Sequence, residues 1–244
     1  ENVSGRQIPI PRGRVLGGSS SINGMLYVRG QAFDYNVWAQ LGNRGWSYDD
    51  VLPYFQKSEN FERGSDNFRG KGGLLNVADM YERHELIDAF IDAGEELGYK
   101  HNPDYNGAVQ DGFGYYQITQ RNGRRESTAR AFLNPAKGRK NLTVEARAHV
   151  TKINFDGKKA VGINYSVDGL EKTENANAEV ILCAGAVQSP QILELSGVGQ
   201  PELLRKHDIE VVHELPGVGE NYRDHYAARM NWRVNKPFTL NEQT

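Results

Sequence analysis

The sequence has very few cysteines: Cys183 is the single one among 244 residues. One thiol cannot form an internal disulfide, and it cannot supply the paired cysteines of common zinc sites. The six histidines are scattered, and no two of them have the spacing of a metalloprotease motif. We therefore expect no bound metal, and a reducing compartment suits the chain. We expect Cys183 itself to be a small, buried hydrophobic residue.

The chain also lacks a large excess of charge of either sign, and it has no long apolar run. The 29 lysines and arginines nearly balance the 31 aspartates and glutamates, which leaves a net charge of −2. This balance argues against a nucleic-acid partner, because nucleic-acid binding needs a strong positive field. The longest apolar run, residues 180–187, is far shorter than the ~20 residues of a membrane-spanning helix. The expected location is the cytoplasm, and membrane association of the whole protein stays open.

Three cofactor and catalytic motifs are absent from the sequence. No G-x-G-x-x-G turn occurs, which disfavours a nicotinamide-dependent dehydrogenase. Glu194 stands two residues before Ser196, where the nucleophile elbow G-x-S-x-G requires glycine, and this excludes a serine hydrolase of that type. No lysine follows Gly17 and Gly18, so the glycine pair does not belong to a P-loop.

The stretch PRGRVLGGSSSINGMLYVRG, residues 11–30, is by contrast rich in glycine, serine and arginine. Gly17 and Gly18 can adopt positive φ, which lets successive backbone N–H groups converge on an anion. Ser19 and its two neighbours add hydroxyl donors. The segment therefore predicts a loop that binds a phosphate or pyrophosphate. The alternative is a flexible linker, but linkers rarely carry an apolar run such as MLYV behind their glycines.

Hydrophobic periodicity along the chain predicts a mixture of helices and strands, which indicates the α/β class. The expected helices are residues 33–38, 48–61 with Ser47 as N-cap, 84–98, 127–133, 189–197 from Ser189-Pro190, and 201–207. The expected strands are residues 74–77, 115–119, 142–150, 160–167 after an Asp156-Gly157 turn, 179–184 and 209–213. The apolar segment 179–184 predicts a strand that is buried on both faces. Residues 61–73 are expected to form an exposed loop or lid.

Four segments resemble signatures of the glucose-methanol-choline (GMC) family of FAD-dependent oxidoreductases, and of its choline-dehydrogenase-like members. They are the loop of residues 11–30, GNRGWSYDDVLPYF from Gly42, GAVQSPQILELSGVG from Gly185 and LPGVGENYRDH from Leu215. They occur in the order that the family uses. The resemblance implies an FAD-binding, Rossmann-like domain that is interleaved with part of an α+β substrate domain.

The resemblance also implies a division of the chain into segments. Residues 1–77 and 127–222 would belong to the FAD-binding domain, residues 78–126 to the substrate domain, and residues 223–244 to the start of the substrate-domain sheet. The family's G-x-G-x-x-G turn and its catalytic histidine near the C-terminus are not in the sequence. We therefore expect an interior segment of a longer enzyme that holds no catalytic residue and is inactive alone.

By motif position, the resemblance places a set of residues against the cofactor. They are Arg14, Val15, Gly17, Gly18, Ser19, Asn23, Gly24, Met25, Leu26, Val150, Ala184 and Gly185. Asn23 could instead make only local bonds, and Val150 could be an ordinary core valine. Ile22 stands where relatives with covalently attached FAD carry histidine, so FAD is expected to be bound non-covalently. His225 matches a family position near the cofactor and is not the catalytic base.

The implied function is oxidation of a primary alcohol, either choline or a neutral alcohol, to its aldehyde by hydride transfer to flavin. In choline-oxidising members we expect a glutamate two residues after the Asp-His pair, where its charge can meet the trimethylammonium group. Ala227 stands there and Arg229 follows nearby, which favours a neutral alcohol. The expected partners are the small-molecule alcohol and an electron acceptor that the sequence does not identify. The alternative function is a non-catalytic module that binds FAD or another nucleotide.

Overall fold

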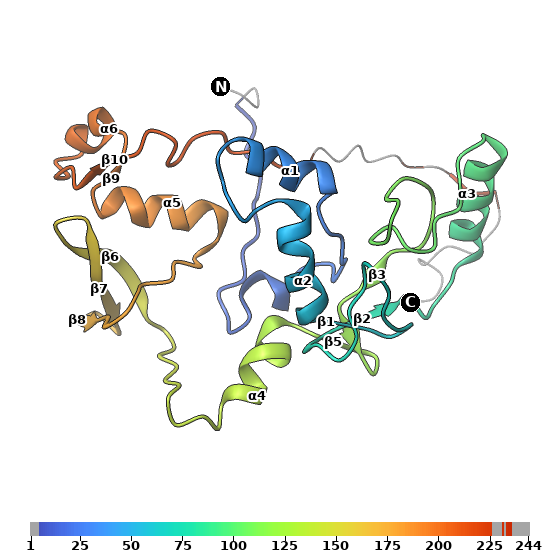
Figure 1. Ribbon diagram of the computed structural model, residues 1–244, viewed down its shortest axis with the longest axis horizontal. Helices are drawn as coiled ribbons and strands as arrows, with labels where there is room; N and C mark the ends of the chain where they lie inside the picture. The colour runs from blue at the N-terminus through green and yellow to red at the C-terminus, as the bar shows by residue number, and fades with distance from the viewer. Residues whose placement is uncertain (1–4, 226–230, 232, 236–244) are drawn as a thin grey trace. The chain divides into compact units, whose positions relative to one another are not determined.

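The computed structural model describes residues 5–225, 231 and 233–235 (Figure 1). The chain divides into two compact units, Glu1–Val144 and Glu145–Thr244. Each unit mixes helices with small sheets. The α/β class that the sequence indicates is therefore confirmed. No helix in the described part of the chain has both the length and the apolar composition needed to cross a bilayer.

The first unit opens with a long loop that contains the short helix η1 (Gly18–Ser21), followed by α1 (Ala32–Gln40) and α2 (Tyr48–Ser58). Helix α2 begins at the predicted N-cap, where the Ser47 side chain accepts a hydrogen bond from the backbone N–H of Asp50. The Asp50 carboxylate accepts the backbone N–H of Ser47 in return, which completes a capping box. The helix ends at Ser58, earlier than predicted, because the chain continues there as a strand.

That strand, β1 (Glu59–Phe61), is parallel to β2 (Leu75–Asp79), and β2 is antiparallel to β3 (Gln117–Ile118). The strands that the sequence predicts around residues 74–77 and 115–119 are thus present. Val77 and Ala78 are fully buried and form the centre of this sheet. The prediction of an exposed loop over residues 61–73 is wrong at Arg69, which is 1% exposed because its guanidinium enters a buried ion cluster.

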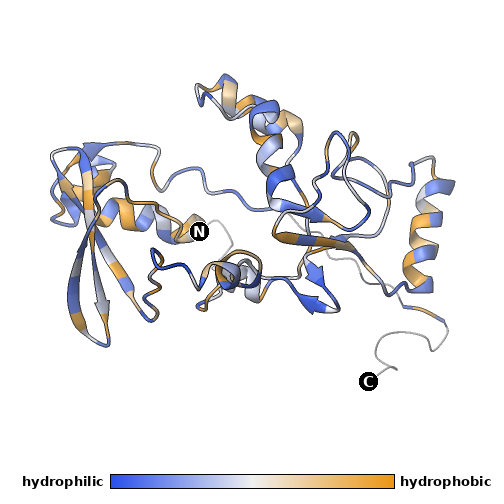
Figure 2. Cartoon of the chain, turned by 60° about the horizontal axis from the view of Figure 1, so that its bottom comes forward, coloured by the Kyte–Doolittle hydropathy of each residue, from blue (hydrophilic) through white to orange (hydrophobic). Residues whose placement is uncertain are grey.

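Helix α3 (Glu85–Glu96) follows β2 and is the predicted amphipathic helix (Figure 2). His84 caps it by accepting the backbone N–H of Leu86 through Nδ1. The hairpin of β4 (Gln120–Arg121) and β5 (Arg124–Arg125) comes next. The helix predicted over residues 127–133 is present as a π-helical turn, η2 (Ala129–Leu133), which continues into α4 (Asn134–Ala136).

The second unit contains an antiparallel meander of β6 (His149–Asp156), β7 (Lys159–Val167) and β8 (Leu170–Asn175). The predicted turn is present, and Gly157 adopts a φ of 57° in it. Helix α5 (Gly185–Leu195) packs on β6 (Figure 1). The buried Ser196 hydroxyl joins the two elements, because it donates to the carbonyl of Ile192 and accepts the backbone N–H of Ile153.

The remaining elements of this unit are short. Helix α6 (Pro201–Lys206) begins at the predicted proline and ends before His207. Strand β9 (Val198–Gly199) runs parallel to β10 (His213–Glu214). The strand predicted over residues 209–213 is therefore wrong for all but its last residue. Val212 donates its backbone N–H to Gly197 instead, outside a named strand.

Two further strand predictions in this unit are wrong. Residues 142–148 are not a strand, and β6 begins only at His149. Residues 179–184 are not a strand either, and Ile181 is 75% exposed. An apolar run becomes a strand only when a neighbouring strand pairs with its backbone. No backbone hydrogen bond joins residues 179–184 to any other described segment.

The predicted start of the helix after this run is also wrong. Helix α5 begins at Gly185 and not at Ser189-Pro190, and Pro190 lies inside it. Ala184 is the N-cap residue, and Gly185 adopts a φ of 91°. Pro190 lacks a backbone N–H and so removes one intrahelical hydrogen bond. The helix nevertheless continues through it and packs on β6.

Candidate cofactor site

The loop of residues 12–26, here called the cofactor loop, has a backbone that depends on glycine. Gly17 and Gly18 adopt φ values of 91° and 55°. A Cβ atom on Gly13 would lie 2.2 Å from the carbonyl oxygen of Gly18, closer than any side chain can approach. A Cβ on Gly17 would lie 2.6 Å from the Ser21 hydroxyl. The role of Gly13 was not predicted from the sequence, where its position between two arginines was the available signal.

The apolar side chains of the cofactor loop are exposed. Val15, Leu16, Ile22 and Leu26 are 46–56% exposed, although hydrogen bonds from Ser20, Ser21 and Thr128 hold the loop backbone around them. Exposed apolar groups along one ordered segment are typical of a surface that a ligand covers. Arg14 is exposed as well, and it forms no ion pair with any residue that the structure describes. The loop thus offers apolar contact area beside an available positive charge, which fits a dinucleotide such as FAD.

A segment about a hundred residues later holds the cofactor loop in place. Thr128 donates its backbone N–H to the Ser20 hydroxyl and its own hydroxyl to the carbonyl of Gly17. The guanidinium of Arg125 reaches three acceptors at the other end of η1: the Ser20 carbonyl at 3.2 Å, the Asn23 carbonyl at 2.7 Å and the Asn23 side-chain oxygen at 2.8 Å. Neither Thr128 nor Arg125 was found from the sequence, because no local pattern joins them to the loop.

Asn23 makes both local and long-range hydrogen bonds. Its side-chain oxygen accepts the backbone N–H of Met25 at 3.0 Å in addition to the guanidinium of Arg125. The alternative of purely local bonds is therefore wrong. Met25 has a φ of 62°, which is uncommon outside glycine, and its carbonyl is fixed by the backbone N–H of Thr119. A backbone held in an unfavourable region is a recurring feature of ligand sites.

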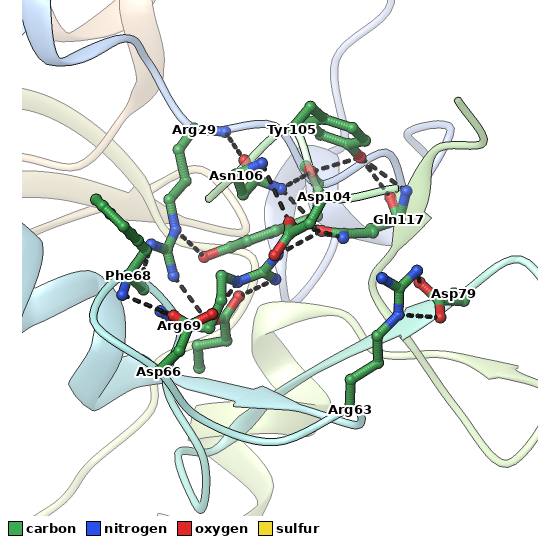
Figure 3. A network of polar contacts seen from close by, with 12 residues as sticks. Arg29, Arg63, Asp66, Phe68, Arg69, Asp79, Asp104, Tyr105, Asn106 and Gln117 are labelled. Carbon is green, nitrogen blue, oxygen red and sulfur yellow. Dashed lines mark hydrogen bonds and ion pairs between the residues drawn. The ribbon is translucent and has the colours of Figure 1, made fainter. Parts of the chain in front are cut away.

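The chain leaves the cofactor loop by pairing with the first sheet. Leu26 forms an isolated bridge with Ile118, and Tyr27 donates its backbone N–H to the Gln117 carbonyl. Arg29 then enters the buried ion cluster, where it contacts Glu59 at 2.8 Å. The end of the loop is thus anchored to the interior of the unit (Figure 3).

The ion cluster balances two arginines against two carboxylates. Arg69 pairs with Glu59 and with Asp104, and it also donates to the side chain of Gln117 (Figure 3). Burial alone lowers the pKa of Arg69, but the hydrogen bonds and charge of Glu59 outweigh it, so that the pKa is raised and the side chain stays charged. Burial also raises the pKa of Tyr105 to about 12. The hydroxyl of Tyr105 donates to the carbonyl of Tyr27, which ties the cluster to the segment after the loop.

The three remaining candidate residues lie in the second unit. Val150 and Ala184 line a cavity of about 730 Å³ between β6, residues 180–184 and α5. Val150 is half-buried. Gly185 follows Ala184 at the start of α5. Cys183 lines the same cavity and is exposed, which corrects the prediction that it is buried, because residues 179–184 lack a covering strand.

The structure therefore places nine candidate residues in the cofactor loop and two, Val150 and Ala184, in the lining of one cavity of the second unit, with Gly185 next to Ala184 in the chain. His225 is exposed, and its backbone N–H bonds to the Asp224 carboxylate. Ala227 and Arg229 lie outside the described residues. Within the described part of the chain, histidine, cysteine, aspartate and glutamate side chains form no cluster that could hold a metal ion.

The chain is similar to curated proteins that are named choline dehydrogenases. It is 46% identical, over 99% of its length, to an oxygen-dependent choline dehydrogenase of Photobacterium profundum. It is 48% identical, over 98% of its length, to an oxygen-dependent choline dehydrogenase of Chromohalobacter salexigens. The chain spans 43% of the length of each of these two relatives.

Solved structures of two oxidising enzymes have a similar fold. The pyridoxine 4-oxidase from Mesorbium loti superposes with a TM-score of 0.79 at 34% identity, covering 84% of this chain and 41% of that protein. An FAD-dependent oxidoreductase from Chaetomium thermophilum gives a TM-score of 0.81 at 30% identity, covering 87% of this chain and 39% of that protein. A family model described as GMC oxidoreductase matches residues 1–227. Because the family model covers nearly the whole chain, and the cofactor loop and the fold agree with it, the chain belongs to the GMC oxidoreductase family.

Proposed function

We propose that this chain is the cofactor-binding part of an FAD-dependent enzyme that oxidises a primary alcohol to its aldehyde. The cofactor loop carries the proposal: its backbone excludes side chains at Gly13 and Gly17, and its own apolar side chains are exposed. The names of the similar proteins support the reaction, since choline and pyridoxine each carry a primary alcohol. When bound, FAD supplies the hydride acceptor, a chemistry that protein side chains lack.

The residues that we assign to FAD have distinct tasks. Glycine backbone at positions 17 and 18 allows close approach of the pyrophosphate, and the free charge of Arg14 attracts it. The side chains that give apolar contact area are Val15, Met25 and Leu26. Ser19, Asn23 and Gly24 supply polar groups and bare backbone along the same loop. We assign Val150, Ala184 and Gly185 of the second unit to the same cofactor. The division of the chain into FAD-domain and substrate-domain segments stays a prediction.

We propose further that FAD is held without a covalent bond. Ile22 is 50% exposed on the cofactor loop at the position where the family's covalent attachment would occur. Its aliphatic side chain has no nucleophilic atom, so it cannot form a bond to a flavin methyl group. Binding of FAD then depends on non-covalent contacts alone.

The test is to purify the whole protein, precipitate it with acid and look for yellow flavin in the supernatant. Flavin that stays in the protein pellet would contradict non-covalent binding, and a protein without flavin that also binds none on titration would contradict the cofactor assignment. The flavoprotein is then mixed with primary alcohols in the absence of oxygen, with a tertiary alcohol as the control. We expect a primary alcohol to bleach the flavin absorbance and the tertiary alcohol to leave it unchanged. A flavin that no alcohol reduces would favour the non-catalytic FAD-binding module.

A further inference from the structure

Arg125 holds one particular side chain of the cofactor loop in addition to the loop backbone. It lies at the end of β5, and a single guanidinium nitrogen reaches both the carbonyl and the side-chain oxygen of Asn23. Thr128, by contrast, bonds only to Gly17 and Ser20 among the loop residues. Of the two residues, only Arg125 contacts the side chain of Asn23, so Arg125 is the one that can set the orientation of the Asn23 amide.

The chemistry of the two donors fixes which end of that amide faces outward. A guanidinium and a backbone N–H can only donate, so the Asn23 atom that both of them meet must be the oxygen. The amide nitrogen then points the other way. It has no hydrogen-bond partner among the described residues, and Asn23 is exposed on the loop that we assign to FAD. Asn23 thus presents a donor, and not an acceptor, to whatever covers the loop.

We propose that Arg125 is a positioning residue that holds Asn23 so that its Nδ2 group donates a hydrogen bond to an acceptor atom of the flavin. The inference rests on the proposed function, because it needs FAD on the cofactor loop. Without Arg125, only the backbone N–H of Met25 holds the amide oxygen. The amide then turns through 180° more easily and presents its oxygen, which repels the ring oxygens and unprotonated ring nitrogens of flavin. Arg125 thereby acts on the cofactor through Asn23 and not by direct contact.

Asn23→Asp separates this role from a purely structural one. The carboxylate can still accept from Arg125 and from Met25, and the bond to Arg125 becomes a charge-assisted pair, so the apoprotein should unfold at an unchanged or higher temperature. The substitution removes the donor that we assign to FAD. The dissociation constant for FAD, measured by titration of the whole apoprotein, should rise by about tenfold or more, as expected for one lost bond to a charged or strongly polar acceptor.

A double-mutant cycle tests whether Arg125 acts through Asn23. Arg125→Met should weaken FAD binding in the native background and have little further effect in the Asn23→Ala background, because contacts that act through one another are not additive. Arg125→Lys should retain part of the affinity, since an ammonium group can donate to some of the same acceptors. Arg124→Met is the matched control: this neighbour is exposed, makes no ion pair with a described residue and should leave FAD binding unchanged.

The outcomes are distinct. If Asn23→Asp binds FAD as tightly as the native protein, or if Arg125→Met costs the same affinity in both backgrounds, the inference is overturned while the proposed function stands. If the native apoprotein binds no FAD, the proposed function fails and the inference fails with it. Lower FAD affinity of Asn23→Asp with an intact apoprotein, together with non-additivity in the cycle, supports the inference.

Discussion

Arg69 and Glu59 form a bidentate ion pair whose side chains are 1% and 0% exposed. The guanidinium of Arg69 donates to both carboxylate oxygens of Glu59, at 2.6 and 3.2 Å. Arg29, which follows the cofactor loop, shares the same carboxylate. Because one buried carboxylate neutralises part of the charge of two buried arginines, Glu59 is the residue on which the cluster depends most.

Glu59→Gln should therefore destabilise the protein strongly. The substitution keeps the shape of the side chain but leaves the two arginines with only Asp104 to balance them. Breaking a buried ion pair in this way costs roughly 3 to 5 kcal/mol of unfolding free energy. Urea denaturation of the native protein and the variant measures the difference. The control is Asp79→Asn, which breaks the half-exposed pair with Arg63 and should cost no more than about 1 kcal/mol. A Glu59→Gln variant as stable as Asp79→Asn would show that the cluster contributes little.

Gly13→Ala should impair FAD binding more than its small size suggests. The new methyl group would lie 2.2 Å from the Gly18 carbonyl oxygen, so the cofactor loop must move to accommodate it. We expect the dissociation constant for FAD to rise by about tenfold, since overpacking of this kind costs on the order of 1–3 kcal/mol. Flavin titration measures it. Gly138→Ala is the control, because a methyl group there meets no atom within 4 Å. Equal FAD affinity of the two variants would contradict the role given to Gly13.

Local features of the fold could be predicted from the sequence, because their causes are also local. Ser47 is recognisable as an N-cap, since the capping box with Asp50 lies within one helical turn. The turn at Gly157 is recognisable for the same reason. Residues 179–184 show the limit of this reasoning: their composition favours a strand, but a strand also needs a pairing neighbour, and none is present among the described residues.

In the candidate site, too, local features could be predicted from the sequence and contacts between distant residues could not. The glycines and Asn23 of the cofactor loop stand out in the sequence because they are adjacent. Arg125 and Thr128 contact the loop across about a hundred residues, and nothing in their own neighbourhood indicates that contact. The buried pair of Arg69 and Glu59 was likewise hidden, because two charged residues near a glycine-rich stretch usually indicate an exposed loop.

Tyr105 should make the stability of the protein fall at high pH. Burial raises the pKa of its hydroxyl to about 12 from an ordinary value of 10. The folded state therefore favours the neutral form, and this contribution is fully present below about pH 10 and is lost as the pH rises towards 12. Urea denaturation at several pH values between 8 and 11 should show a smaller loss of unfolding free energy for Tyr105→Phe than for the native protein. Parallel pH profiles of the two proteins would exclude this role for Tyr105.

The whole protein should oxidise a neutral primary alcohol better than choline. The names of its similar relatives point to choline, but Ala227 stands where a choline oxidiser is expected to carry glutamate, and Arg229 adds a positive charge nearby. Both lie outside the described residues, and it is their charge that favours the neutral alcohol. A close pair of unit charges is worth about 4 kcal/mol at an effective dielectric constant near 20, which is enough to decide between substrates. The measurement is kcat/KM for choline and for an uncharged primary alcohol with one electron acceptor. Ala227→Glu should shift the ratio towards choline, whereas Ala227→Gln, the matched neutral change, should not. A native ratio more than about tenfold in favour of choline, equal to ~1.4 kcal/mol, would show that another part of the protein supplies the negative charge.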